Sequence, residues 1–566
     1  MKQKVVNLIK LGLRDIYDIS LPDIESYIEI PSNIELGDFS LPCFTLAKTL
    51  KKSPIIIADE LCTHLCHNNK DNIISKVNAV NGYLNIFVDR VYFINQIITD
   101  VLKPFYGSSD IGAGKTICMD YSSPNIARNF HVGHIRTTLI GNSFAKIYSK
   151  LGYNVVRINH LGDWGTQFGK LIVAYKKWSD KKMVEENGIK ELLRIYVLFG
   201  NEAVNNPELN DEARAWFAKM ENGDEEALSI WQWFKDISLL EFERVYKMLN
   251  IEFDSYTGES FYMDKVPALV TELKDKNLLV ESQGANIINL DEYGMPPCLI
   301  TKKDGSSIYH SRDIAAALYR KQTYHFEKCI YVTGMEQKLH FSQVFKAIEL
   351  MGYEWANDLY HIPYGLVSMD GEKLSTRKGN VIYAEDILSE AVSRALNAIQ
   401  EKNPDIQDKI NTAKKIGIGS VIFHDLSNYL IRDVHFNWDE VLSFDGMTAP
   451  YIQYTYARSK SILRKSHIDN TDVDLGYLAD DISYELIKKL ALYPEIVRDA
   501  AAKFEPCIIA RYAYHLSNLF NKFYHECRIL SADDQIRKSR IVLVDAVQKV
   551  ISDSMSLLGI ECPEEM

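Results

Sequence analysis

The stretch Asp120-Tyr-Ser-Ser-Pro-Asn-Ile-Ala-Arg-Asn-Phe-His-Val-Gly-His134 decides how the central part of this chain folds. It follows an apolar run, Thr116–Met119, and places two histidines around a glycine where a helical pattern begins. The first turn of a helix presents unpaired backbone N–H groups and the positive end of the helix dipole to an anion. His131 and His134 would add two imidazole donors there, so the stretch predicts a site that activates a nucleotide phosphate.

The same stretch belongs to a β-α-β pattern. A strand over Thr116–Met119, a helix over about residues 133–151 and a strand over Asn154–Ile158 follow one another. Such a unit favours a parallel sheet with a right-handed crossover, and ligands of these sheets bind at the carboxyl ends of the strands. Later runs at Lys328–Val332 and His361–Val367 predict two more strands. The predicted fold class of this region is therefore α/β.

The rest of the chain divides around this sheet. The pattern predicts a separate α+β unit over residues 1–108. This unit includes helices over Lys4–Leu13, Leu41–Leu50 and Pro54–Cys66. Residues 109–385 hold the sheet and a largely helical insertion over about residues 178–303. The pattern predicts a helical linker over residues 386–447 and an all-α domain over residues 448–566. Within that domain, one helix is expected over Ile482–Lys503.

Composition excludes several classes of protein. The 566 residues are 46% hydrophobic and 25% charged, as in soluble globular proteins. No apolar run approaches about 18 residues, so we expect no membrane span. Nine cysteines without paired spacing indicate reduced thiols and a cytoplasmic protein. The net charge of −12 argues against a non-specific nucleic-acid coat, although a structured RNA could still dock on a local basic face.

Two motif-like stretches are set aside. Gly112-Ala-Gly-Lys-Thr116 resembles the end of a P-loop, but a strand follows it where a P-loop requires a helix. Cys62-Thr-His-Leu-Cys-His67 lies in a helical pattern without a second ligand pair at zinc spacing, so no structural zinc is expected.

A second phosphate signal lies some 240 residues after the histidines, in Met369-Asp-Gly-Glu-Lys-Leu-Ser-Thr-Arg-Lys-Gly-Asn380. Three cations fall within six residues, and glycines stand near both ends. By itself this is typical of a solvated basic loop. Together with the two histidines after a parallel strand, it predicts a loop that closes over a triphosphate and neutralises the leaving pyrophosphate.

His-Val-Gly-His followed by Lys-Leu-Ser-Thr-Arg resembles the paired signatures of class I aminoacyl-tRNA synthetases. Four further sequence segments narrow the resemblance to the arginyl-tRNA synthetase family. The resemblance covers nearly the whole chain. The four segments are Ser122-Ser-Pro-Asn-Ile-Ala127, Asn159-His-Leu-Gly-Asp-Trp-Gly-Thr-Gln-Phe-Gly169, Tyr309-His-Ser-Arg-Asp313 and Thr448-Ala-Pro-Tyr-Ile-Gln-Tyr454.

The resemblance implies a Rossmann-like catalytic domain with a helical insertion, an N-terminal domain that contacts the tRNA corner and a C-terminal anticodon-binding domain. It also implies a reaction. L-arginine is activated with ATP, accompanied by Mg²⁺, to arginyl-adenylate and is then transferred to the 3′ end of tRNA(Arg). The family default is a monomer. The insertion shows no evident hydrolytic site, so an editing domain is not expected.

The resemblance further implies roles for individual residues. His131 and His134 would hold the α-phosphate, Gly133 would allow close approach of adenine, and Lys373 would hold the pyrophosphate. Asp120 and Asp313 would meet the guanidinium fork, and Tyr309 would pack the substrate's stem. The further ATP-binding positions are Pro124, Val132, Gly334, Glu336, His340, Ser375 and Lys378. The further arginine-binding positions are Ser122, Asn125 and Gln337. The tRNA-binding positions are Tyr451, Tyr454, Arg458 and Met566.

The chain departs from the class pattern at one place. Thr376 stands where the basic motif usually carries a second lysine, and Arg128 stands where many arginyl family members place a compensating lysine. We expect Arg128, helped by Arg377 or Lys378, to supply the missing charge. Two alternatives stay open here. One is a catalytically silent relative that binds tRNA or arginine. The other is a generic nucleotidylyltransferase, which would leave the terminal helical domain unexplained.

Overall fold

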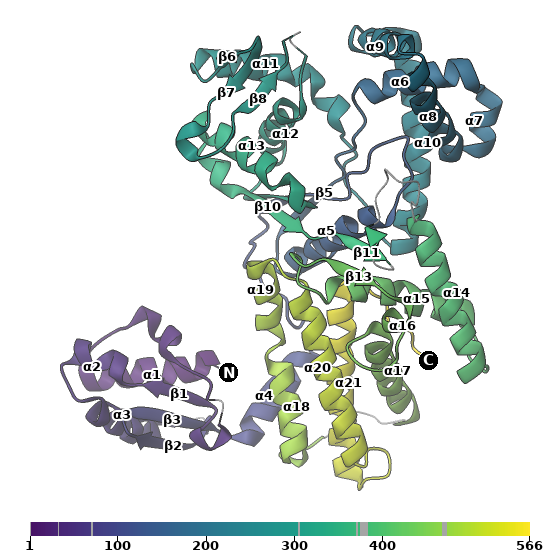
Figure 1. Cartoon of the computed structure of the whole chain (residues 1–566). Coiled ribbons are helices and arrows are strands. Elements are labelled where there is room, and N and C mark those ends of the chain that lie inside the picture. The colour runs from purple at the N-terminus through teal and green to yellow at the C-terminus, as the bar shows by residue number, and fades with distance from the viewer. Residues whose placement is uncertain are drawn as a thin grey trace. The chain divides into compact units, whose positions relative to one another are not determined.

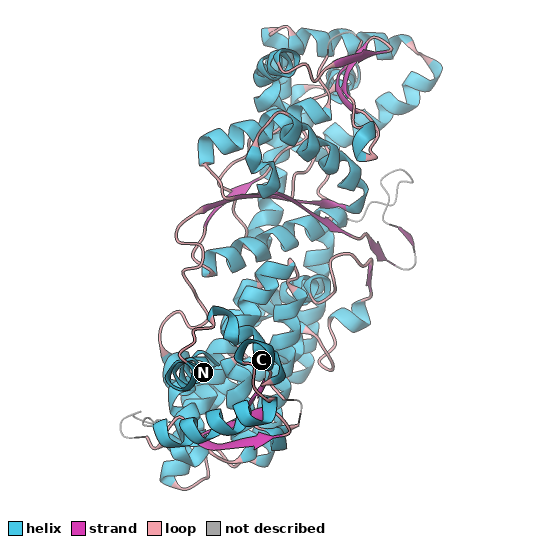
Figure 2. Ribbon diagram, turned by 90° about the vertical axis from the view of Figure 1, so that its left-hand side faces the viewer, coloured by secondary structure: helices cyan, strands magenta, loops and turns pink. Residues whose placement is uncertain are grey.

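The computed structural model describes residues 2–31, 33–69, 72–303, 306–369, 372–373, 383–466 and 473–566. Helices make up most of these residues, and the strands form short sheets (Figure 2). The chain separates into two compact units. One consists of residues 1–106, 461–492 and 518–550, and the other of residues 107–460, 493–517 and 551–566.

The first unit contains an antiparallel sheet in the order β1-β3-β2. Its strands are β1 (Phe39–Pro42), β2 (Ile74–Val80) and β3 (Tyr83–Val88). Buried apolar side chains of α1 and α3, among them Ile9 and Leu61, form its core. The helices of residues 1–106 are α1 (Lys2–Tyr17), α2 (Phe44–Leu50), α3 (Pro54–Asn68) and α4 (Arg90–Leu102), with 3-10 turns at Pro22–Tyr27 and Ile34–Leu36. The predicted helix over Leu41–Leu50 was wrong in its first residues, because Leu41 and Pro42 pair with Leu84 and Tyr83 as a strand.

The second unit is built on a four-stranded parallel sheet in the order β10-β9-β4-β5. Figure 1 labels its two edge strands, β10 and β5. Its strands are β4 (Thr116–Asp120), β5 (Asn154–Ile158), β9 (Lys328–Gly334) and β10 (Leu359–Tyr364). The chain leaves β4 through α5 (Val132–Lys150) to β5 on one side, and β9 returns on the other side. The strand order therefore reverses between β4 and β9, which is where open α/β sheets bind ligands.

The insertion separates β5 from β9. It contains α6 (Thr166–Trp178), α7 (Lys181–Asn187), α8 (Ile189–Asn205), α9 (Glu208–Glu221), α10 (Glu225–Leu249) and α11 (Val266–Asp275), with a 3-10 turn at Glu259–Lys265. A small antiparallel sheet follows, formed by β6 (Val280–Ser282), β7 (Ala285–Ile288) and β8 (Cys298–Thr301), with a 3-10 turn at Asp291–Tyr293. Helix α12 (Tyr309–Tyr324) then leads to β9, and α13 (Lys338–Leu350) connects β9 with β10 between 3-10 turns at Met335–Gln337 and Glu354–Asp358.

The predicted strand over His361–Val367 is two strands. β10 ends at Tyr364, and β11 (Val367–Met369) joins a second sheet with β12 (Glu372–Lys373) and β13 (Val434–Phe436). Gly365 marks the break, because a Cβ there would lie 2.6 Å from the backbone carbonyl carbon of Arg432. Only a residue without a side chain allows the chain to pass from one sheet to the other at this point.

The described residues after Tyr383 are mostly helical, as expected, although the strand β13 was not predicted among them. Their helices are α14 (Ala384–Lys402), α15 (Lys409–Leu426), α16 (Trp438–Val441), α17 (Ala449–Ser466), α18 (Asp481–Ala491), α19 (Tyr493–Lys503), α20 (Cys507–Glu526) and α21 (Asp534–Leu557), with a 3-10 turn at Leu475–Leu478. The single helix predicted over Ile482–Lys503 was wrong. It is divided into α18 and α19, and Pro494 stands at the second position of α19, where a proline is tolerated but cannot continue a preceding helix.

Candidate active site

The two signature histidines cap the start of α5. The backbone N–H of Gly133 donates to Nδ1 of His131 at 3.1 Å, and the backbone N–H of His131 donates to Nδ1 of His134 at 3.2 Å. The result is a reciprocal capping box made of imidazoles. Because both Nδ1 atoms accept hydrogen bonds, each neutral ring carries its proton on Nε2. Both Nε2–H groups are therefore donors that the helix start itself does not use.

Both histidines are held neutral. Burial, with a smaller contribution from the charge of Arg128, lowers the pKa of His131 to about 4. The pKa of His134 lies well below its ordinary value, first because of burial and then because of His131 and Arg128. The rings stack with their centroids 3.8 Å apart, which two imidazolium ions would resist. At neutral pH the turn thus offers neutral N–H donors next to the cation of Arg128.

Gly133 leaves room for the His131 ring. A Cβ at this position would lie 2.9 Å from Cε1 and 3.0 Å from Nδ1 of His131. Any side chain at residue 133 would therefore displace the ring that accepts this residue's own N–H. The structure gives the glycine a role in the capping box itself, which the sequence reasoning did not foresee.

The chain between β4 and α5 is strained and held by long-range contacts. Ser122, Ser123 and Ala127 have φ values of +71°, +47° and +58°. Such values are unfavourable for residues other than glycine and persist only where the surroundings enforce them. The Ser122 hydroxyl lies 2.8 Å from the Tyr246 hydroxyl and 2.8 Å from Thr138 Oγ1. The predicted contact of Ser122 with arginine would therefore compete with a buried structural hydrogen bond.

The loop that follows β5 supports the same stretch from the other side. The N–H of Gly162 donates to Pro124 O at 3.1 Å, and the N–H of Ile126 donates to Gly162 O at 3.2 Å. A Cβ on Gly162 would lie 1.9 Å from Oδ1 of Asn125. Pro124 is buried, whereas Asn125, which was predicted to hold the amino acid, is exposed.

The chain returns to the histidines after the basic stretch. Tyr383 forms an antiparallel bridge with His131, and the N–H of Ala384 donates to Phe130 O at 2.9 Å. On the other side, Lys373 pairs through its backbone with Ser368 in the β11–β12 ladder. Ser375, Thr376, Arg377 and Lys378 lie outside the described residues. The flank that follows the basic stretch is thus anchored at the start of α5, and the flank that precedes it is held in the β11–β12 ladder.

Arg136, on the same helix, fixes the start of this stretch. Its buried guanidinium donates to the carbonyls of Leu366, Leu430 and Arg432 at 3.2, 3.1 and 2.9 Å. Its Nε lies 3.6 Å from Asp425. The segment before β11 and the segment before β13 are therefore tied to α5 by one buried cation, which the sequence analysis did not single out.

Asp120 is engaged by an arginine of the chain itself. Nη2 of Arg320 lies 2.7 Å from Oδ2 of Asp120, and Ser123 Oγ donates to Oδ1 at 2.8 Å. The exposed fractions of the two side chains are 1% for Arg320 and 8% for Asp120. Asp120 was predicted to meet the substrate's guanidinium. The structure shows that a resident guanidinium already contacts it, so it is not a free carboxylate.

Asp313, the second predicted carboxylate, has histidine partners. Nε2 of His340 lies 2.6 Å from Oδ2, and Nε2 of His160 lies 3.8 Å from Oδ1. Burial alone would raise the pKa of Asp313, but the hydrogen bond from His340 and the charges nearby hold it below its ordinary value. His340 was predicted for the ATP segment, and its ring is instead directed at this carboxylate. His340 therefore connects the segment after β9 with Asp313.

The remaining predicted positions lie along the same end of the sheet. Gly334 ends β9 and is buried, and Glu336 and Gln337 follow it as exposed residues of a 3-10 turn. Val132 is buried at the start of α5, whereas Tyr309, at the start of α12, is 58% exposed. Tyr309 also packs against the Arg312 guanidinium, whose carbon lies 4.9 Å from the ring centre.

Three family models match the chain. The model for the class I (R) tRNA synthetase catalytic domain matches residues 98–438. The model for the N-terminal domain of arginyl tRNA synthetase matches residues 3–88, and that for the DALR anticodon binding domain matches residues 452–566. The arginine–tRNA ligase of Alkaliphilus metalliredigens (strain QYMF) is 50% identical over 568 residues, covering 100% of this chain and 99% of the relative. The chain belongs to the arginyl-tRNA synthetase family.

Other members of the arginyl-tRNA synthetase family are similar over the same length. The arginine–tRNA ligase of Clostridioides difficile (strain 630) is 50% identical over 554 residues, which is 97% of each chain. The solved arginyl-tRNA synthetase of Thermus thermophilus superposes with a TM-score of 0.82 at 23% identity over 100% of both chains. That of Plasmodium falciparum gives 0.79 at 23% identity, covering 100% of this chain and 99% of the other. At these identities the solved structures establish the shared fold.

The residues predicted to bind tRNA differ in exposure. Tyr454 is 43% exposed, and the Arg458 guanidinium carbon lies 4.7 Å from its ring centre. Tyr451 is partly buried and packs against Tyr514, with ring centres 5.6 Å apart. Met566 packs against a buried cluster of α14 and α15 residues, and its carbonyl accepts from Asn403 at 3.3 Å. In this synthetase Tyr454 is therefore the exposed member of the set, whereas Tyr451, Arg458 and Met566 are each partly buried.

Among the residues that the structure describes, no three His, Cys, Asp or Glu side chains are grouped as metal ligands. Nor is any helix in the described part of the chain long and apolar enough to cross a membrane. In this arginyl-tRNA synthetase His160 and His340, which lie outside the signature, both contact the carboxylate of Asp313.

Proposed function

We propose that this chain activates L-arginine with ATP and transfers it to tRNA(Arg), with the residue roles that follow. The observation that carries the proposal is the pair of neutral histidines, whose Nε2–H donors are unused by the helix they cap and lie next to the anchored flank of the basic stretch. A nucleotide phosphate is the ligand that such a turn favours.

In the first step a carboxylate oxygen of arginine attacks the α-phosphorus, and the bond to the bridging oxygen of the pyrophosphate breaks. His131 and His134 would donate to the α-phosphate, where negative charge grows. Arg128, which is exposed, would add a cation there. Lys373, Ser375, Arg377 and Lys378 would hold the leaving pyrophosphate. In the second step the terminal ribose hydroxyl of the tRNA attacks the adenylate carbonyl, and AMP leaves. Catalysis would consist of positioning and charge stabilisation.

Asp120 and Asp313 are the two carboxylates predicted to meet the substrate's guanidinium, and they differ in their partners. Asp120 is paired with the buried guanidinium of Arg320, whereas Asp313 contacts the rings of His340 and His160. We assign direct recognition of the substrate's guanidinium to Asp313, because Asp120 is already paired with Arg320. Tyr309 would pack the aliphatic stem, and Asn125 and Gln337 would hold the amino acid's backbone groups.

Mg²⁺ would enter with ATP, since this ion prefers phosphate oxygens and retains waters instead of requiring an all-protein cage. Bound there, it would neutralise phosphate charge. Residues 1–108 would contact the tRNA corner, and residues 448–566 would bind the anticodon through Tyr451, Tyr454 and Arg458, with Met566 nearby. The nine cysteines are all free thiols, which supports a reducing cytoplasmic location, and we take the monomer as the working state.

The test is ATP–pyrophosphate exchange with each of the common amino acids, with and without tRNA, followed by aminoacylation of tRNA(Arg). Among the amino acids, we expect only arginine to support exchange. We also expect this exchange to require tRNA. Exchange with a different amino acid would overturn the specificity. An Arg128→Ala variant with an unchanged activation rate would overturn the role given to that residue.

A further inference from the structure

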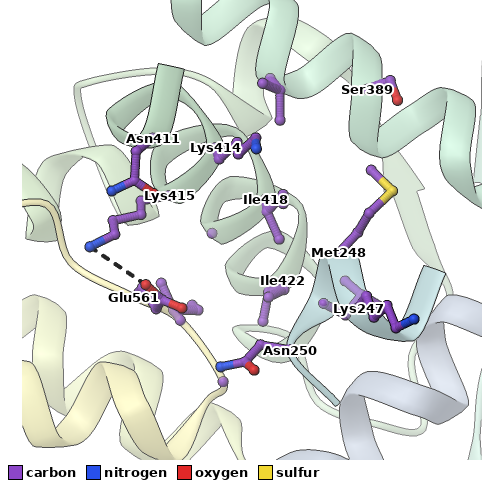
Figure 3. A pocket seen from close by; sticks show the side chains of 15 residues that line it. Lys247, Met248, Asn250, Ser389, Asn411, Lys414, Lys415, Ile418, Ile422 and Glu561 are labelled. Carbon is purple, nitrogen blue, oxygen red and sulfur yellow. Dashed lines mark ion pairs between the residues drawn. The ribbon is translucent and has the colours of Figure 1, made fainter. Parts of the chain in front are cut away.

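A pocket of about 630 Å³ lies within the second unit, and none of its lining residues belongs to the stretch Asp120–His134 (Figure 3). Four segments surround it. They are the end of α10, Ser389 and Val392 of α14, residues between Asn411 and Ile422 of α15 and residues 559–561. None of the nucleotide, arginine or tRNA roles given above uses it.

The pocket is positively charged. Lys247, Lys414 and Lys415 line it, and Glu561 is the one carboxylate among its lining residues. Nζ of Lys415 lies 3.5 Å from Glu561, as the dashed line in Figure 3 marks. Lys247 and Lys414 are exposed, and neither forms an ion pair with any described residue. Two uncompensated cations at one hollow are notable in a chain of net charge −12, because local potential decides whether an anion docks.

Hydrogen bonds and close contacts hold the walls of the pocket in place. The Gln453 amide donates to Lys415 O at 2.9 Å and to Glu561 O at 2.8 Å, so α17 fixes both α15 and the C-terminal stretch. A Cβ on Gly419 would lie 2.9 Å from the Gln453 amide and 2.9 Å from Ile560. Apolar groups of Ile418 and Ile422 and amides of Asn250 and Asn411 complete the lining. The lysine ammonium groups only donate, and the asparagine amides can donate through their NH₂ groups, so the pocket matches an oxyanion better than a cation.

We propose that this pocket binds a backbone phosphate of the tRNA. The inference rests on the proposed function, because RNA is the polyanion that this protein would meet. Lys247 and Lys414 are exposed, which suits a phosphate on a continuous chain. Helix α10, which lines the pocket, and helix α17, which is hydrogen-bonded to its wall, also carry or contact residues with the roles proposed above. Gln453 precedes Tyr454 on α17, and Tyr246, one turn before Asn250 on α10, contacts Ser122.

The test compares tRNA(Arg) binding by the wild type, a Lys247→Gln/Lys414→Gln variant and a Lys274→Gln control, each across a series of salt concentrations. Lys274 is an exposed lysine on α11, outside the pocket. A phosphate contact releases condensed counterions, so the double variant should lower the slope of log affinity against log salt by about 0.7–0.9. We expect affinity to fall about tenfold near 0.1 M salt. The KM for arginine should not change, and phosphate-ethylation interference should disappear at one backbone position.

Equal affinity and slope in the double variant and the wild type would overturn the proposal, as would an equal loss in Lys274→Gln. Inorganic phosphate serves as the second probe. If phosphate raises the melting temperature of the wild type but not of the double variant, while tRNA affinity is unchanged, the site takes a free anion and the RNA assignment is refuted. Failure of the wild type itself to bind or charge tRNA(Arg) would instead count against the proposed function.

Discussion

The buried pair of Asp120 and Arg320 gives the sharpest prediction. The two side chains are 8% and 1% exposed, and 2.7 Å separates Oδ2 from Nη2. Removing one partner of such a pair leaves an uncompensated buried charge, which costs about 3–5 kcal/mol. We therefore expect Arg320→Met to lower the free energy of opening around β4 by that amount. Asp120→Asn should cost a similar amount, because it leaves the guanidinium without its carboxylate.

The double variant Asp120→Asn/Arg320→Met removes both charges together. Its cost should be smaller than the sum of the two single costs, with a coupling energy of about 2 kcal/mol or more. A matched control is Arg157→Met on the neighbouring strand β5. Arg157 pairs with Asp254 at 2.8 Å, but these side chains are 31% and 41% exposed, so water screens the pair and we expect a cost of about 1 kcal/mol or less.

Hydrogen exchange of the β4 amides, followed by mass spectrometry, measures the opening free energy where the pair lies. Exchange between ATP and pyrophosphate measures arginine use in the same proteins. Arg320→Met should raise the KM for arginine, because the unpaired Asp120 carboxylate would then compete with Asp313 for the substrate's guanidinium. If the single costs add within about 0.5 kcal/mol, the two residues are not coupled and the assignment of substrate recognition to Asp313 loses its basis.

The remaining predictions concern α5. Gly133→Ala should reduce the exchange kcat about 100-fold, because the new Cβ would lie 2.9 Å from the His131 ring. Its melting temperature should be nearly unchanged, and an unchanged kcat would contradict the capping-box geometry. Because burial lowers the pKa of His131 to about 4, its NMR titration should show a neutral ring from pH 8 to about 5. The unfolded chain, with a histidine pKa of about 6.5, takes up this proton first, so stability should be lost as pH falls from 6.5 towards 4. Arg128→Ala should raise the pKa of His131, since the Arg128 charge contributes to lowering it, and an equal pKa in both proteins would show that this charge is not felt. Arg136→Met should lower the exchange kcat about tenfold or more without changing arginine affinity, because three backbone carbonyls and Asp425 lose their cation. Equal loss of arginine affinity would point to general unfolding instead.

Local signals explain what the sequence could predict. The strand–turn–helix pattern around His131 depends on neighbouring residues, and the helices after residue 384 follow from periodicity. The contacts of Asp120 and Asp313 do not follow from any local pattern in the sequence. Arg320 lies 200 residues after Asp120, and only the folded sheet and α12 bring them together. The position at which β10 ends could not be predicted either. Val367 belongs to a different sheet because it pairs with Val434, and no local sequence pattern indicates this pairing.

The histidine capping box sets protein stability against catalysis. Serine, aspartate or asparagine at a helix start usually stabilises more than other residues, so His131→Ser or His131→Asp should give an equally or more stable α5. Either change would remove an Nε2–H donor, and aspartate would also repel phosphate. Selection for thermal stability alone would therefore drive this position towards an inactive enzyme, and a stabilised variant library should retain His131 only when arginine activation is screened as well.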